Sequence, residues 1–215
     1  VKVAGRDGAR AKLSAREGWC RMRLFVALAL PDNIRWQLRL LSGGLAGAMR
    51  WVPPENLHIT LRFLGEVDGR DAHYVDAALA GIRAPRFSLR LKGVDAFTSS
   101  QRVKAVYAGV EKQPAIQHLH DKVESAVVRA GLEPDGQKYV PHVTLTRPKD
   151  TPLNKLQHYL AEHSLFKTEP FEVTHFTLYS SEMGSEQSVY TALRSYALST
   201  PNGLAEAAAE KRDAL

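Results

Sequence analysis

Cysteine is almost absent from this sequence, which has only Cys20 among its 215 residues. One cysteine cannot close an internal disulfide, and it cannot build a cysteine-based zinc cluster. This composition is typical of a reducing compartment, and we expect a cytoplasmic protein.

Long apolar runs are also missing. No stretch reaches the roughly 18 residues that a membrane-spanning helix needs, so we expect no membrane partner. The run LFVALAL at residues 24–30 is short and passes directly into a helical pattern. This favours a first strand of the fold over a secretion signal.

Positive charge is present but unevenly distributed. The net charge is +6, and residues 1–21 alone carry +4 of it. The remainder is too small for a broad basic face, so any anion site is expected to be local. We expect residues 1–21 to form a disordered basic extension, with an RNA-attracting arm as the alternative, and residues 200–215 to form a helical or frayed tail.

Residues 22–199 are expected to form a single bilobal domain that arose by duplication. Hydrophobic periodicity predicts the order strand, helix, strand, helix, strand over residues 23–97, and the same order over residues 103–181. A last strand is predicted at residues 188–198. The offsets agree with the order, because His58 to His142 and Phe87 to Phe171 both span 84 positions.

This repeat predicts an α+β fold of two lobes. Each lobe would be an antiparallel-rich sheet with helices on its outer side. A pseudo-twofold relation would bring equivalent strands face to face across an active-site cleft between the lobes.

Each repeat contains a histidine and a threonine two positions apart, in the segments NLHITLRFLGEVDG and YVPHVTLTRPKD. Side chains alternate along a strand, so His58 and Thr60 point to one face, and His142 and Thr144 do the same. Their apolar neighbours point the other way and can be buried. Each strand therefore presents a polar, titratable face beside a buried one.

Two histidines facing one cleft can serve as general base and general acid, because the imidazole pKa lies near neutrality. Two threonine hydroxyls beside them can donate hydrogen bonds to phosphoryl oxygens. A single histidine in a strand would more often be structural. The repetition of the pattern favours catalysis.

These segments resemble the paired His-x-Thr motifs of the two-histidine (2H) phosphoesterase superfamily, in particular the RNA 2′,3′-cyclic phosphodiesterases once described as 2′-5′ RNA ligases. The resemblance extends to MRLFVALALP, RWVPPENLHITLRFLGEV and VYTALRSYAL, and so covers most of residues 22–199. It implies hydrolysis of RNA or nucleotide ends with a 2′,3′-cyclic phosphate to 2′-phosphomonoesters, without a metal or other cofactor.

The resemblance also implies roles for individual residues. His58 resembles the acid that protonates the leaving O3′, and His142 the base that activates water, although the sequence itself is symmetric on this point. Thr60, Thr144 and Arg147 would hold the phosphoryl oxygens. One chain supplies both motifs, so we expect a monomer.

Several further residues have a weaker basis. Arg62 shares the face of His58 by parity and could add a phosphate contact, or it could be a solvated arginine. Phe63 is the leading candidate for stacking a base, whereas packing roles are favoured for the other three aromatic candidates. These are Trp51, Tyr139 and Tyr179. The six other histidines are expected to lie on the surface or in packing roles.

Two alternatives to hydrolysis stay open. The same site could join RNA ends by 2′-5′ ligation, although water at about 55 M competes with a second strand. A non-catalytic RNA-end binder is the other alternative. Intact histidines and threonines in both motifs argue against it, because binding alone needs only charge and stacking.

Overall fold

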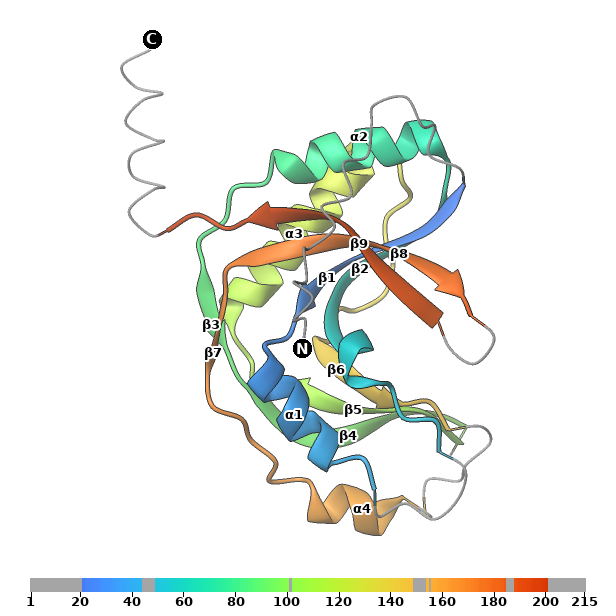
Figure 1. Ribbon diagram of the computed structural model, residues 1–215, viewed down its shortest axis with the longest axis vertical. Helices are drawn as coiled ribbons and strands as arrows, with labels where there is room; N and C mark the ends of the chain where they lie inside the picture. Colours follow the sequence, from blue (N-terminus) through green and yellow to red (C-terminus); the bar gives the residue numbers. More distant parts are fainter. Residues whose placement is uncertain are drawn as a thin grey trace, which may run out of the picture.

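Seven antiparallel strands form the main sheet in the order β4-β5-β6-β2-β1-β8-β9, and β3 and β7 form a separate pair (Figure 1). This computed structural model describes residues 21–43, 49–100, 102–148, 154, 156–184 and 188–200. The strands are β1 (Met22–Ala29), β2 (His58–Val67), β3 (Phe87–Leu89), β4 (Leu91–Ser99), β5 (Arg102–Val110), β6 (His142–Thr146), β7 (Phe171–Val173), β8 (His175–Met183) and β9 (Ser188–Ala197). The helices are α1 (Asp32–Leu40), α2 (Gly69–Ala80), α3 (Pro114–Arg129) and α4 (Gln157–Glu162), with a 3-10 turn η1 at Pro54–Asn56. The predicted extension and tail lie outside the described residues, except for Arg21 and Thr200.

The main sheet divides into two lobes at the junction of β2 and β6. These strands are paired only through Ile59 and Val143. The first lobe contains β2, β1, β8 and β9, and helices α2 and α3 pack on it. The second lobe contains β6, β5 and β4, and α4 packs against β4. Helix α1 is tied to α4, because the Tyr159 hydroxyl donates to the Leu41 carbonyl at 2.8 Å. The predicted α+β fold of two lobes is confirmed. The equivalent strands β2 and β6, however, lie side by side in one sheet and not face to face across a cleft as predicted.

The two halves of the sequence exchange one strand each, β4 and β8. β4 belongs to the first half of the chain but pairs with β5 in the second lobe, and β8 belongs to the second half but pairs with β1. The sequence pattern predicts each of these strands without predicting its partner. As a result, neither half of the chain forms a complete lobe.

The duplication is visible in the register as well as in the order of the elements. Ile59 pairs with Val143 and Ser88 pairs with Glu172, and the two residues of each pair are 84 positions apart. Each residue therefore meets its own equivalent. A pseudo-twofold axis must pass through both strand pairs, since only residues next to such an axis can meet their equivalents.

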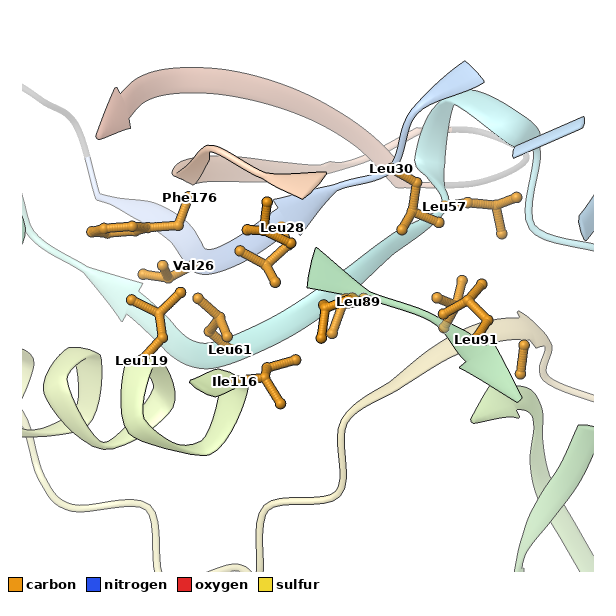
Figure 2. Packing of buried hydrophobic residues seen from close by; sticks show 14 of the residues in the cluster. Val26, Leu28, Leu30, Leu57, Leu61, Leu89, Leu91, Ile116, Leu119 and Phe176 are labelled. Atoms are coloured by element: carbon orange, nitrogen blue, oxygen red, sulfur yellow. The ribbon is translucent and has the colours of Figure 1, made fainter. Parts of the chain in front are cut away.

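The core lies under β1 and β2 and is closed by helix α3 (Figure 2). Apolar residues recur every three or four positions in α3, so that Ile116 and Leu119 face the sheet and are almost fully buried. They pack below Leu61 of β2, near Phe176 of β8. Full burial of each such side chain stabilises the fold by about 2 kcal/mol. This packing holds the face of β2 opposite to His58 and Thr60.

Candidate active site

A cavity of about 280 Å³ lies where β2 and β6 meet. Six of the seven predicted site residues line it, together with residues of β1, β8 and β9. The six that line it are His58, Thr60, Phe63, His142, Thr144 and Arg147. Both halves of the duplication thus contribute to one cavity, through the same strand of each half.

The two histidines are oriented in the same way. The Nδ1 atom of His58 lies 2.7 Å from the Asn56 carbonyl oxygen, and Nδ1 of His142 lies 2.7 Å from the Val140 carbonyl oxygen. A carbonyl can only accept, so Nδ1 must be the protonated nitrogen in both rings. This leaves each Nε2 for the cavity, where it can hold or release a proton.

Aromatic rings surround both histidines, and the sequence patterns did not indicate this shell. The His58 ring packs at 5.0 Å from Phe25 and edge-on at 5.3 Å from Tyr190. The His142 ring packs edge-on against Phe97 at 4.8 Å and Tyr107 at 5.3 Å. These four rings come from β1, β9, β4 and β5, so no local pattern around the motifs could have indicated them.

Burial lowers the pKa of both histidines. The pKa of His58 falls from 6.5 to about 4, chiefly because burial removes water from the ring. A hydrogen bond to the Asn56 backbone raises this pKa, and the charges of Arg147 and His142 lower it further. The pKa of His142 is also lowered, mainly by desolvation and then by Arg147. Both imidazoles are therefore neutral at pH 7 in the free protein, and a bound phosphate anion would raise both pKa values.

Strand alternation predicted that Arg62 lies on the same face as His58. In the structure its side chain points away from the cavity. It is buried, and its guanidinium pairs with Glu124 of α3 and donates to the carbonyl oxygens of Phe63 and Glu133. The predicted phosphate contact by Arg62 is wrong. Arg62 thereby binds helix α3 and the segment after it to the back of β2.

A β-bulge explains this reversal. Ala27 pairs with Thr60 and Val26 pairs with Arg62, so Leu61 is an extra residue on β2. Beyond the bulge the alternation of faces is inverted. Phe63 consequently turns toward the cavity, 54% exposed, in the place that Arg62 was expected to take.

The other aromatic candidates lie mainly in packing positions. Tyr179 stacks on Phe25 at 5.2 Å, and Tyr139 stacks on His120 at 3.9 Å while its hydroxyl donates to the Thr60 carbonyl. Trp51 borders a neighbouring cavity. None of the six other histidines lines the cavity that contains His58 and His142.

The residues that the structure describes contain no group of three or more His, Cys, Asp or Glu side chains placed to hold a metal ion. None of the described helices is long and apolar enough to cross a membrane.

The fold and the duplicated strands define a two-lobed protein with one His-x-Thr pair from each half. Residues 37–184 match the family model of the 2′-5′ RNA ligase superfamily, and the chain belongs to this superfamily.

Relatives and solved structures agree with this membership. The RNA 2′,3′-cyclic phosphodiesterase of Aeropyrum pernix is 40% identical over 102 residues, which are 47% of this chain and 58% of that protein. The protein of the same name from Escherichia coli K12 is 30% identical over 184 residues, covering 82% of this chain and 96% of that one. The crystal structure of E. coli LigT complexed with 3′-AMP has a TM-score of 0.68 at 28% identity, covering 84% of this chain and 99% of that one.

Proposed function

We propose that this protein is an RNA 2′,3′-cyclic phosphodiesterase that hydrolyses cyclic phosphate ends to 2′-phosphomonoesters. The observation that carries the proposal is the matched pair of histidines, each held through Nδ1 with Nε2 left for one cavity. The two relatives above, which bear this name, support it. A cytoplasmic monomer is part of the proposal, since one chain supplies both histidines.

The chemistry needs one base, one acid and donors for the phosphoryl oxygens. His142 takes a proton from water through Nε2 as the water oxygen attacks phosphorus. The bound phosphate anion raises the pKa of His58, so that its ring carries a proton on Nε2 as well as on Nδ1. The bond from phosphorus to O3′ breaks, and O3′ takes the Nε2 proton of His58. Thr60, Thr144 and Arg147 stabilise the charge that develops on the non-bridging oxygens.

The ends of the cavity differ, which gives the site a direction. Antiparallel pairing of Ile59 with Val143 puts Phe63, late in β2, and Arg147, just beyond β6, toward opposite ends. If the terminal base stacks on Phe63, the C2′ side of the ribose faces that end, because the base is attached to the neighbouring C1′. O3′ then lies toward Arg147.

This direction supports His58 as the acid. His58 precedes Ile59 on β2 and so lies toward the Arg147 end, where O3′ leaves. His142 precedes Val143 on the antiparallel strand and lies toward the other end. Water attacking in line with the departing O3′ would approach from the side of His142.

Phosphorus NMR tests the proposal directly. The purified protein is incubated with adenosine 2′,3′-cyclic phosphate and EDTA, and conversion to the 2′-phosphate alone is expected. His142→Ala should abolish turnover. A strict need for added divalent metal would contradict the mechanism, and formation of the 3′-phosphate would contradict the assignment of acid and base.

The second candidate activity is 2′-5′ ligation of RNA ends at the same site. Its test adds an RNA with a 5′-hydroxyl to an RNA that ends in a cyclic phosphate. A 2′-5′-linked product exceeding the hydrolysis product would favour ligation. We expect hydrolysis to dominate, because water is present at about 55 M and the attacking strand must be bound and oriented.

A further inference from the structure

A second cavity adjoins the catalytic one at its Arg147 end. It has a volume of about 600 Å³ and contains neither histidine of the motifs. The two cavities share five lining residues, which are Val52, Asn56, Arg147, Ser188 and Tyr190. The catalytic cavity therefore continues past Arg147 into additional space.

The lining of the second cavity combines cations with aromatic rings. Arg50 and Arg147 provide the positive charge, and Trp51 and Tyr190 provide aromatic rings. Among its described lining residues there is no carboxylate to repel an anion. Arginine beside aromatic rings is the usual composition of a site for single-stranded nucleic acid, where guanidinium binds phosphate and bases stack.

Residues 50–52 form one wall of the second cavity, and contacts between their backbone and β6 hold this wall in place. Thr146 donates its hydroxyl to the Arg50 carbonyl at 2.8 Å, and the Val52 amide donates to the Leu145 carbonyl at 2.8 Å. Trp51 forms an isolated bridge with Thr146 between these contacts. The wall is thus fastened to the strand that contains His142, so its distance from the reacting phosphate is defined.

The covalent structure of ribose indicates what this space receives. The base is attached to C1′, next to C2′, and the 5′ carbon is attached to C4′, next to C3′. The base and the 5′ chain therefore leave a 2′,3′-cyclic phosphate on opposite sides. With the terminal base at Phe63, the 5′ chain is directed toward Arg147 and the second cavity.

We propose that the second cavity is a subsite for the penultimate nucleotide of the RNA, with Arg50 binding the phosphate that links it to the terminal nucleotide. Its base packs near Trp51 and Tyr190. This assignment rests on the proposed function. It makes an oligoribonucleotide of at least two nucleotides the preferred substrate over a cyclic mononucleotide.

The test compares three substrates by kcat/KM: adenosine 2′,3′-cyclic phosphate, the diadenylate with a terminal 2′,3′-cyclic phosphate, and the same dinucleotide with a neutral methylphosphonate linkage. We expect the charged dinucleotide to exceed the mononucleotide by about tenfold or more, which is the typical effect of one charge-assisted hydrogen bond. The methylphosphonate should lose most of this advantage.

Arg50→Ala should lower kcat/KM for the charged dinucleotide about tenfold more than for the mononucleotide. The matched control is Arg70→Ala, which removes the same charge from an exposed position in the first turn of α2 and should preserve the ratio of the two substrates.

The outcomes separate the two proposals. Equal kcat/KM for mononucleotide and dinucleotide, or equal loss for both in Arg50→Ala, would overturn the subsite while leaving the phosphodiesterase intact. Absence of turnover with all three substrates would refute the proposed function, and the subsite with it.

Discussion

Leu61 and Leu145 lie 84 positions apart, and each is the extra residue of a β-bulge, the first in β2 and the second in β6. Beyond each bulge the face alternation is inverted, so that Phe63 and Arg147, again 84 apart, both reach the cavity. The backbones of the two halves are therefore equivalent at the site, whereas their side chains differ. One end provides an aromatic ring and the other a cation.

Arg62 should matter for stability rather than for binding phosphate. Arg62→Met leaves the Glu124 carboxylate without its partner, and we expect the free energy of unfolding to fall by about 3 kcal/mol in urea titrations. The double variant Arg62→Met/Glu124→Leu should recover much of this loss, since both charges are then removed. An unchanged stability with a selective rise in KM would instead restore Arg62 as a substrate ligand.

The pH profile should reflect the lowered histidine pKa values. Catalysis needs one neutral and one protonated imidazole, and both pKa values are lowered from 6.5, so kcat/KM, which reports the free enzyme, should be bell-shaped with its maximum below pH 6.5. The bound phosphate raises both pKa values, and the kcat profile should move to higher pH. A kcat/KM maximum above pH 7.5 would contradict this electrostatic account.

His58 should make the protein less stable in acid. Its pKa is about 4 in the folded state and 6.5 in the unfolded state, so the unfolded chain binds more protons between these values. The free energy of unfolding should therefore fall as the pH drops from about 6.5 to 4, by at most about 3 kcal/mol from this residue. Denaturant titrations of His58→Gln at pH 7 and pH 4.5 should show a smaller difference than those of the wild type. An equal difference would locate the acid sensitivity elsewhere.

The two threonines should contribute similarly to catalysis. Thr60→Val and Thr144→Val each remove one hydroxyl donor at nearly constant volume, and each should lower kcat about 100-fold. Circular dichroism and thermal unfolding check that the fold is retained. A loss confined to KM would indicate that the hydroxyls bind substrate and transition state equally.

Local patterns were sufficient to predict the centre of the site. Strand alternation put His58 with Thr60 and His142 with Thr144, and the common offset of 84 identified the duplication. The bulge at Leu61 escaped prediction because an inserted strand residue has no signature in a sequence of alternating apolar positions. Arg62 was misplaced for that reason alone.

The aromatic shell and the strand exchange escaped prediction for a different reason. Phe25, Tyr107 and Tyr190 approach the histidines through pairings between distant strands, and a periodic pattern specifies a strand without specifying its neighbour. The same holds for β4 and β8, which lie in the lobe opposite to the one expected from their half of the chain.

The exchanged strands set an order of events during synthesis. The sheet of the first lobe joins β1, the first strand of the described chain, to β8 and β9, the last two. Until β8 emerges, β1 keeps one edge unpaired, and contacts this distant in sequence form slowly. Tyr190, which packs on His58, is supplied by β9. A growing chain with both motifs already made would therefore still lack a finished site until β9 has been made.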